Sequence, residues 1–311
     1  MTSKNSFIST LFAVCSGTKV FTKIINFGLL KTFWHLILLG IICAFVFTAV
    51  NSPSMKREIT ETCNYLQSQF GNIVVKKDGV YPQLNPNKSR DLNYRYLQFN
   101  YVPSVNDLKD IKINSDMNYS GFVWTPKGIV GWMKLDSNDV ILYPALTNLG
   151  STKLFKFLPK DQVQNYAKEN SLTSFNNLML KICGQAEIPI IGFFTLNKTN
   201  SFSDFSNTIY YWSAGIMLIR FFFTILINAL LYSLIFAAVY KFTGRNTLYN
   251  LNFKKFFSIA VYASFPAIII GTLLELAQPP WFQYQTIFIF AFVIYLIAVT
   301  NKLRKSQNIQ G

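Results

Sequence analysis

Apolar residues gather in four runs, each long enough to cross a lipid bilayer. An α-helix rises about 1.5 Å per residue, so about 20 residues cover a hydrocarbon core of ~30 Å. The runs are Thr32–Val50, Phe221–Tyr240, Phe256–Leu274 and Trp281–Thr300. This pattern predicts four transmembrane helices, at residues 32–54 and about 211–240, 256–276 and 281–300.

Residues 55–208, between the first and second runs, have the mixed pattern of a folded domain. Ile73–Val75 and Val80–Tyr81 flank Lys77-Asp-Gly79, a sequence typical of a hairpin turn. Further runs rich in β-branched and aromatic residues predict strands at Tyr94–Val102, Ile111–Ile113, Tyr119–Trp124, Ile129–Leu135 and Val140–Tyr143. Together they predict a small antiparallel meander.

Helical periodicity predicts helices that flank this sheet, at Met55–Phe70, Lys160–Glu169 and Leu172–Cys183. The Asn-rich stretch Asn197–Asn207 is typical of a loop. The predicted fold class is therefore α+β: four transmembrane helices with a mixed α/β domain inserted between helices 1 and 2. The predicted segments are 1–31, 32–54, 55–208, 209–301 and 302–311.

The amino-terminal stretch Ser6–Phe27 carries apolar residues among Ser and Thr, with Lys19 and Lys23. One or two short helices lying in the inner headgroup plane would give this pattern, and so would a loosely ordered tail. About 30 residues precede the first apolar core. A leader of that length favours an uncleaved anchor over a signal peptide.

Positive charge is concentrated next to the predicted spans. The chain has 29 basic and 14 acidic residues, but residues 55–208 hold 17 basic and 13 acidic ones and are nearly balanced. The three short segments on one side of the predicted membrane hold basic residues and no acid: Lys4, Lys19, Lys23, Lys31, Lys241, Arg245, Lys254, Lys255, Lys302, Arg304 and Lys305. This distribution argues against a nucleic-acid-binding surface.

The same distribution predicts the orientation, because cytoplasmic loops carry an excess of Lys and Arg. We expect a multi-pass protein of the plasma membrane with both termini in the cytoplasm. Residues 55–208 then form an extracytoplasmic domain, and the short connection Ala277–Pro280 lies on the same side.

Two of the four cysteines, Cys63 and Cys183, lie in the predicted extracytoplasmic domain. In an oxidising compartment they are candidates for a disulfide, and the alternative is two separate buried thiols. Cys43 lies in the first span and Cys15 in the inner stretch. The chain has no CxxC or Cys/His spacing, so we predict no metal and no cofactor.

Catalytic signatures are missing from the sequence. His35, the one histidine, is expected at the inner end of the first span, far from any evident nucleophile. P-loop, GxSxG and HExxH spacings do not occur. We therefore assign no catalytic residue, and the sequence favours a non-catalytic protein.

Arg220 and Glu275 are the two charged residues closest to the predicted membrane core on its outer side. They have opposite signs at the same expected depth, which suggests an interhelical ion pair. Independent snorkelling of each side chain to the headgroups is the alternative. Deeper polar groups are Thr224, Asn228 and Ser264, and such groups more often hold helices together than line a path.

The run Phe253–Pro266, entering the third span, carries a family resemblance together with Ser6–Phe27, the first span and Lys77-Asp-Gly79. In these features the chain resembles an uncharacterised bacterial integral-membrane family, a domain of unknown function whose members include maltodextrin-utilisation membrane proteins. The resemblance implies the four-span topology and a bacterial inner-membrane location. It implies no catalytic residues.

These features favour a non-catalytic inner-membrane protein, an accessory, sensing or assembly component for an envelope or transport process. Its expected partners are the lipid bilayer and a membrane protein or a second copy, and no nucleic acid. One alternative is a membrane enzyme acting on an envelope lipid or glycan at the outer leaflet. Another is a small transporter or channel subunit. An aromatic groove near Trp124 and Trp132 would indicate an exported binding module.

Overall fold

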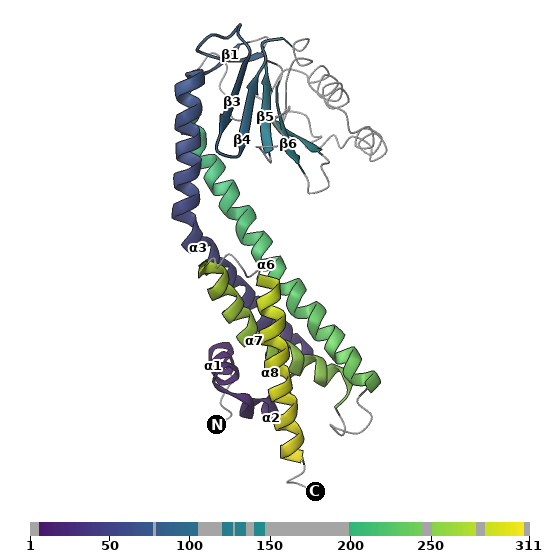
Figure 1. Ribbon diagram of the computed structural model, residues 1–311. Helices are drawn as coiled ribbons and strands as arrows, with labels where there is room; N and C mark the ends of the chain where they lie inside the picture. The colour runs from purple at the N-terminus through teal and green to yellow at the C-terminus, as the bar shows by residue number, and fades with distance from the viewer. Residues whose placement is uncertain are drawn as a thin grey trace. The chain divides into compact units, whose positions relative to one another are not determined.

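A computed structural model describes residues 6–76, 79–104, 120–126, 128–134, 140–146, 199–243, 251–277 and 284–307 (Figure 1). The chain divides into two compact units. The first, which we call the helical unit, comprises Met1–Met55 and Tyr210–Gly311. The second, the sheet unit, comprises Lys56–Ile209.

Four long apolar helices supply the helical unit, and each is long enough to cross a membrane. They are α3 (Leu29–Phe70), α6 (Phe202–Thr243), α7 (Phe253–Ala277) and α8 (Tyr284–Gln307). The sequence prediction of four membrane-length apolar helices is therefore confirmed. The helices α3 and α6 are longer than the predicted spans. The residues of α3 after Met55 and the residues of α6 before Tyr210 belong to the sheet unit.

Short helices precede α3 in the helical unit: α1 (Phe7–Ser16), the 3₁₀ turn η1 (Thr18–Val20) and α2 (Phe21–Ile24). The side chain of Ser6 caps α1 by accepting a hydrogen bond from the backbone N–H of Ser9. Val14, Phe21 and Ile24 are fully buried in the same core as α7 and α8. Of the two alternatives for this stretch, short helices are therefore present.

The helix α7 is the most buried of the four, with its neighbours α8 and α1 packed against it (Figure 1). It continues as a helix through Pro266, as α3 does through Pro53. Close approach depends on Gly271, where an added Cβ would lie 2.9 Å from the Tyr284 ring. Large side chains on the outward faces of α3, α6 and α8 are exposed, as lipid-facing residues are.

The sheet unit contains two small sheets between the first and second long helices. The smaller sheet has the order β2-β1-β8, from β1 (Ile73–Lys76), β2 (Gly79–Pro82) and β8 (Thr199–Asn200). Val75 pairs with Val80 in the antiparallel β1–β2 hairpin. The predicted hairpin across Lys77-Asp-Gly79 is thus confirmed.

The larger sheet has the order β3-β4-β5-β6-β7. Its strands are β3 (Arg90–Tyr94), β4 (Leu97–Tyr101), β5 (Ser120–Thr125), β6 (Gly128–Lys134) and β7 (Val140–Leu146). The prediction of a purely antiparallel meander was wrong, because β4 and β5 pair in parallel. A parallel pair cannot be joined by a tight turn, and in the chain β4 ends at Tyr101 while β5 begins at Ser120.

The strand predicted at Tyr94–Val102 was also wrong at its first residues. Tyr94 ends β3 and pairs with Leu97, the first residue of β4. Arg95, between them, adopts the left-handed region with φ 55°, which few non-glycine residues do. Propensity gave no warning of this turn, because its residues are ordinary strand formers or charged.

The predicted loop Asn197–Asn207 was wrong as well, since β8 and the start of α6 occupy it. The start of α6 has reciprocal capping: Asp204 Oδ2 accepts from the Ser201 N–H at 3.2 Å, and Ser201 Oγ accepts from the Ser203 N–H at 3.1 Å. The predicted strand Ile111–Ile113 and helices Lys160–Glu169 and Leu172–Cys183 lie outside the described residues.

Candidate functional site

His35 and Tyr262 form a buried polar pair in the helical unit. His35, on α3, and Tyr262, on α7, are joined by a hydrogen bond of 2.9 Å between the Tyr hydroxyl and the His Nδ1. His35 is 7% exposed and Tyr262 is fully buried. The edge of the Phe7 ring lies against His35, with centroids 5.4 Å apart. Enclosed by rings, His35 makes the contacts of a residue that holds two helices together.

Glu275 lies near the end of α7, and its carboxylate accepts a hydrogen bond from the backbone N–H of Tyr284 at 3.0 Å. Tyr284 is the first residue of α8. The first N–H groups of a helix have no partner within the helix, and a negative charge there interacts favourably with the helix dipole. Glu275 therefore caps α8.

Arg220, the predicted ion-pair partner of Glu275, is exposed on α6. Both ion pairs found within the described ranges involve Glu61 of the sheet unit. Pairing of Arg220 with Glu275 stays a prediction. Thr224, one turn further along α6, directs its hydroxyl to the Arg220 carbonyl at 2.9 Å.

The ring of Tyr284 is packed in a ladder of aromatic residues inside the helical unit. It meets Phe221 edge-on, with centroids 5.4 Å apart, and stacks on Phe288 at 6.0 Å. Phe221 in turn stacks on Phe47 at 4.1 Å. The Tyr284 hydroxyl is buried and has no hydrogen-bond partner among the residues that the structure describes. This ladder joins α3, α6 and α8 through apolar contact.

Aromatic residues also form the core of the sheet unit. The Trp124 indole Nε1 donates to the Val80 carbonyl at 3.1 Å, which links β5 of the larger sheet to β2 of the smaller one. Tyr101 is fully buried and its hydroxyl donates to the Pro86 carbonyl at 2.7 Å. Phe70 meets both Tyr101 and Trp124 edge-on. Trp124 is thus a core residue and not part of an exposed groove, and the Trp132 side chain lies outside the described part.

Two buried carboxamides on the larger sheet were missed at the sequence level. Gln98 is fully buried and donates from Nε2 to the Asp91 carboxylate at 3.0 Å. Asn100 is 4% exposed, and within the described ranges its side-chain oxygen has no hydrogen-bond partner. The signal was the alternation in Leu97-Gln-Phe-Asn-Tyr101, which puts Gln98 and Asn100 on the face opposite the aromatic core.

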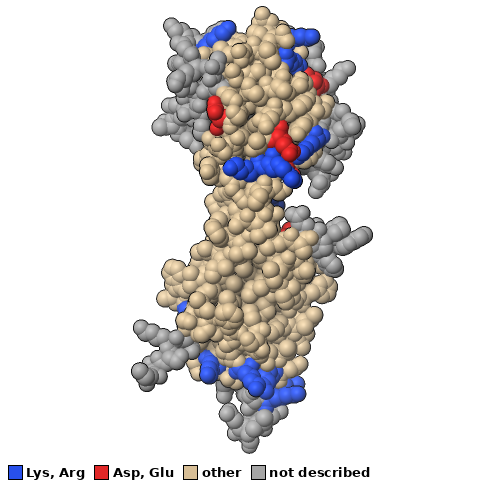
Figure 2. Space-filling model, turned by 90° about the vertical axis from the view of Figure 1, so that its left-hand side faces the viewer, with Lys and Arg blue, Asp and Glu red and all other residues tan. Residues whose placement is uncertain are grey.

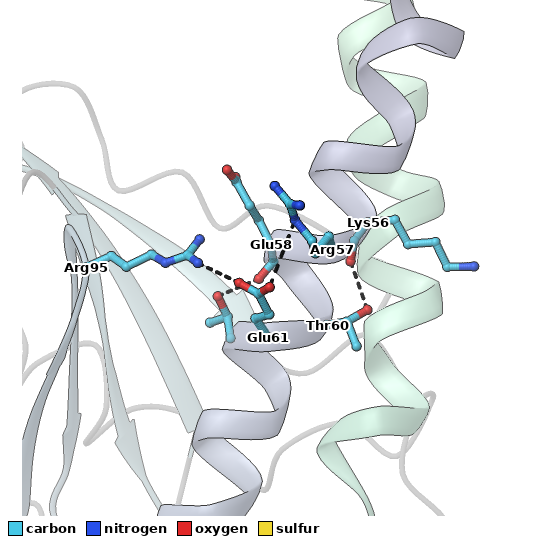
Figure 3. A network of polar contacts seen from close by, with 7 residues as sticks. Lys56, Arg57, Glu58, Thr60, Glu61 and Arg95 are labelled. Atoms are coloured by element: carbon cyan, nitrogen blue, oxygen red, sulfur yellow. Dashed lines mark hydrogen bonds and ion pairs between the residues drawn. The ribbon is translucent and has the colours of Figure 1, made fainter.

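A charged surface lies where the β3–β4 turn meets α3, and we call it the hairpin surface: Arg57, Glu61, Arg95 and Tyr96. Glu61 accepts from Arg95 at 2.5 Å and lies 4.0 Å from Arg57. Figure 3 shows Arg95 reaching to Glu61 from the turn, while Lys56 points away. Tyr96 is 51% exposed. Tyr and Arg are the residue types that dominate protein–protein contacts.

The turn that carries the hairpin surface is packed against α3. Tyr94, preceding the turn, stacks on Tyr65 of α3 with ring centroids 4.4 Å apart. Thr60 and Thr62 direct their hydroxyls to the backbone carbonyls of Lys56 and Glu58, one turn earlier on α3. The three charged side chains are each at least 41% exposed, and exposed pairs contribute only about 0–1 kcal/mol. These ion pairs therefore contribute little to stability.

Over the described ranges, no group of three His, Cys, Asp or Glu side chains is placed to hold a metal ion. Cys63 is buried at 5% exposure on the part of α3 in the sheet unit, and burial raises the pKa of its thiol to about 11. Cys183 lies outside the described residues, so its pairing with Cys63 stays a prediction.

Four apolar membrane-length helices with an inserted α+β unit define the chain as a multi-pass membrane protein. Residues 158–300 match the model of a family described as protein of unknown function, DUF1189. This match confirms the expected resemblance to an uncharacterised family. No curated protein and no solved structure matches the chain.

Proposed function

We propose that this protein is a non-catalytic component of a bacterial inner membrane that displays its sheet unit on the extracytoplasmic side. Both termini would lie in the cytoplasm. In this role it acts as an accessory, sensing or assembly factor for an envelope or transport process, and the hairpin surface is its contact with a partner protein.

The observation that carries the orientation is the gathering of positive charge at one end of the helical unit (Figure 2). Lys254 and Lys255 lie in the first turn of α7, and Arg304 and Lys305 in the last turn of α8. The helices α7 and α8 follow one another in the chain and pack side by side. The first turn of α7 and the last turn of α8 therefore lie at the same end. Positive residues next to membrane spans stay in the cytoplasm.

Exposed aromatic residues mark a membrane–water boundary near the start of the membrane part of α6. Tyr211 is 71% exposed and Trp212 is 67% exposed. Such rings prefer the membrane–water boundary, with the apolar body in lipid and the polar edge in water. They lie at the beginning of the membrane part of this helix, whereas Lys241 lies near its end.

A non-catalytic role is supported by how the candidate side chains are used. His35 holds Tyr262, Glu275 caps α8, and Glu61 pairs with two arginines. Each of these groups serves a structural contact in the described part of the chain. The exposed Tyr96, flanked by Arg95, is by contrast available to a partner.

Orientation is tested by substituted-cysteine labelling with a membrane-impermeant maleimide, in a variant whose native cysteines are replaced. Asn87, exposed in the sheet unit, and Lys305, exposed in the helical unit, take the reporter cysteines one at a time. We expect Asn87→Cys to react in intact cells and Lys305→Cys only after permeabilisation. Labelling of both from the same side would overturn the topology.

The role is tested by photo-crosslinking in cells. A photoreactive amino acid replaces the exposed Tyr96 and, as a matched control on the same hairpin, the buried Phe99. We expect one reproducible partner at position 96 that is missing at position 99, identified by mass spectrometry. Turnover of an envelope lipid or glycan by the purified chain alone would overturn the non-catalytic role.

A further inference from the structure

The helix α1 has two apolar faces, of which only one is used inside the protein. Val14 is fully buried, and Phe7 and Leu11 pack against the same core. On the other side Ile8 is 62% exposed and Phe12 is 68% exposed. Positions four apart lie on one face of a helix, so these two residues form an apolar stripe directed outward.

The position of α1 is fixed by named contacts. The Tyr295 hydroxyl, on α8, donates to the Val14 carbonyl and lies 3.3 Å from the Gly17 carbonyl. The Phe21 ring, in α2, also lies against Tyr295, with centroids 6.1 Å apart. The outward stripe is therefore held against the helical unit, next to lipid-facing helices, and is not part of a free tail.

Basic side chains surround this end of the helical unit. Lys19 in η1 and Lys23 in α2 are exposed, and both short elements contact α8. Lys254, Lys255, Arg304 and Lys305 are exposed as well. Within residues 6–31, 251–258 and 299–307 there is no Asp or Glu. Figure 2 shows Lys and Arg side chains at this end with no acidic one among them.

The placement of Lys254 and Lys255 is unfavourable for the isolated helix. Both are in the first turn of α7, where the helix dipole already provides partial positive charge. Asn252 caps this helix, its side-chain oxygen accepting from the Lys255 N–H at 3.0 Å. Two lysines and the positive end of the helix dipole together create a strongly positive end, which an anion would stabilise.

We propose that this end of the helical unit binds anionic phospholipid headgroups, with Ile8 and Phe12 of α1 inserted at the headgroup–acyl boundary. Lys19, Lys23, Lys254 and Lys255 would then contact the lipid phosphates. A helix with an apolar stripe and flanking lysines binds this boundary through apolar burial and attraction to negative lipids. The bilayer supplies both chemistries at one surface.

Lipid preference is tested with the full chain in nanodiscs of mixed phosphatidylcholine and phosphatidylglycerol, with the co-purified phospholipids counted by native mass spectrometry. We expect enrichment of phosphatidylglycerol above its bulk fraction. Lys19→Gln/Lys23→Gln and Lys254→Gln/Lys255→Gln should each lower it about five-fold or more, since one surface charge confers roughly that factor. The control Lys76→Gln/Lys88→Gln, in the sheet unit, should leave it unchanged.

Equal enrichment in wild type and both double variants would overturn the proposal. So would selective displacement of the lipid by inorganic phosphate beyond that caused by chloride at the same ionic strength, because the site would then prefer free phosphate. A third measurement places a photoreactive amino acid at Phe12 and, as control, at Phe7. We expect lipid adducts at position 12 and none at position 7. If position 12 gave protein adducts and no lipid adducts, the proposal would be contradicted. None of these results depends on which side of the membrane this end occupies.

Discussion

The Glu275 carboxylate, at the end of α7, accepts the backbone N–H of Tyr284, the first residue of α8, with 3.0 Å between nitrogen and oxygen. One helix thus caps the next across their connection. The Tyr284 ring is held at the same place by Gly271, which leaves room for it. The end of α7 and the start of α8 are therefore fixed together by a charge and by a shape.

Replacing Glu275 tests this cap. Glu275→Ala removes the acceptor, and we expect a loss of about 0.5–2 kcal/mol, the usual effect of a lost helix cap. Glu275→Gln keeps an acceptor but removes the charge and should lose less. Thermal unfolding in detergent measures both. The predicted ion pair with Arg220 would make Arg220→Ala as harmful as Glu275→Ala, whereas a cap alone would leave Arg220→Ala close to neutral.

Removing the Tyr262 hydroxyl should loosen α7 from α3. Tyr262→Phe leaves the buried His35 Nδ1 without its partner. Hydrogen bonds between membrane helices contribute about 0.6 kcal/mol on average and up to ~1.7. Because this pair is buried among rings, we expect the upper part of that range. A double-mutant cycle with His35→Ala measures it, Tyr211→Phe on an exposed site is the control, and strict additivity would contradict the coupling.

Trp124 should be more sensitive than any exposed aromatic residue of the sheet unit. Trp124→Phe keeps most of the ring volume but leaves the Val80 carbonyl without its donor, at a cost of about 1–3 kcal/mol. Hydrogen exchange of the β2 segment Gly79–Pro82 in the full chain reports the effect. Tyr96→Phe, on the exposed turn, serves as control. Unchanged exchange in Trp124→Phe would show that the two sheets are joined by other contacts.

Cys63 is predicted to be unreactive while the protein is folded. Thiolates are the reactive form, and burial raises the pKa of this thiol from 9.0 to about 11. At pH 8 iodoacetamide should modify the exposed Cys15 first and Cys63 only after unfolding. Labelling followed by mass spectrometry separates the two sites. Equal labelling rates in the native protein would contradict the burial of Cys63.

The same pKa shift predicts a dependence of stability on pH. The folded protein holds the Cys63 proton more tightly than the unfolded chain does, so the contribution is complete below pH 9. It should be lost as the pH rises from 9 to about 11. Cys63→Ala should make that slope shallower in chemical unfolding curves, and the buried Tyr101, whose pKa is also raised by burial, should keep the rest above pH 10. A disulfide to Cys183 would make the slope shallower in wild type also, and a thiol count under denaturing conditions distinguishes the two cases.

The helical part was predictable because a bilayer imposes length and apolarity on every segment that crosses it. Runs such as Phe256–Leu274 therefore identify themselves without tertiary information. The β1–β2 hairpin was predictable for a similar local reason, since Asp-Gly between two β-branched runs favours one turn. In both cases the sequence within a short window determines the structure.

The parallel pairing of β4 with β5 depends on a connection rather than on the strands, so their alternation could not reveal it. The turn at Arg95 is held by Glu61, which lies 34 positions earlier in the sequence. Among candidate sites, the hairpin surface was missed for the same reason. Glu61 and Arg95 looked like ordinary solvated charges until the fold brought them together.

The start of α6 was partly predictable, because Ser201 and Asp204 have capping-box spacing. The second cap could not be predicted, because the Phe202 N–H donates to the side-chain oxygen of Gln67, 135 positions away. The Asn-rich composition outweighed a two-residue signal. A contact between the two ends of a domain leaves no mark in either local window.

The pairing of β8 with β1, next to the contact between Gln67 and Phe202, affects how the sheet unit folds during synthesis. Strand β8 pairs with β1 through Thr199 and Asn200, so the smaller sheet stays incomplete until the ribosome has passed them. Nascent chains ending before this point would expose the edge of β1 to other proteins. The unit should consequently need protection during biogenesis, and truncation just before Thr199 should yield aggregation rather than a smaller folded protein.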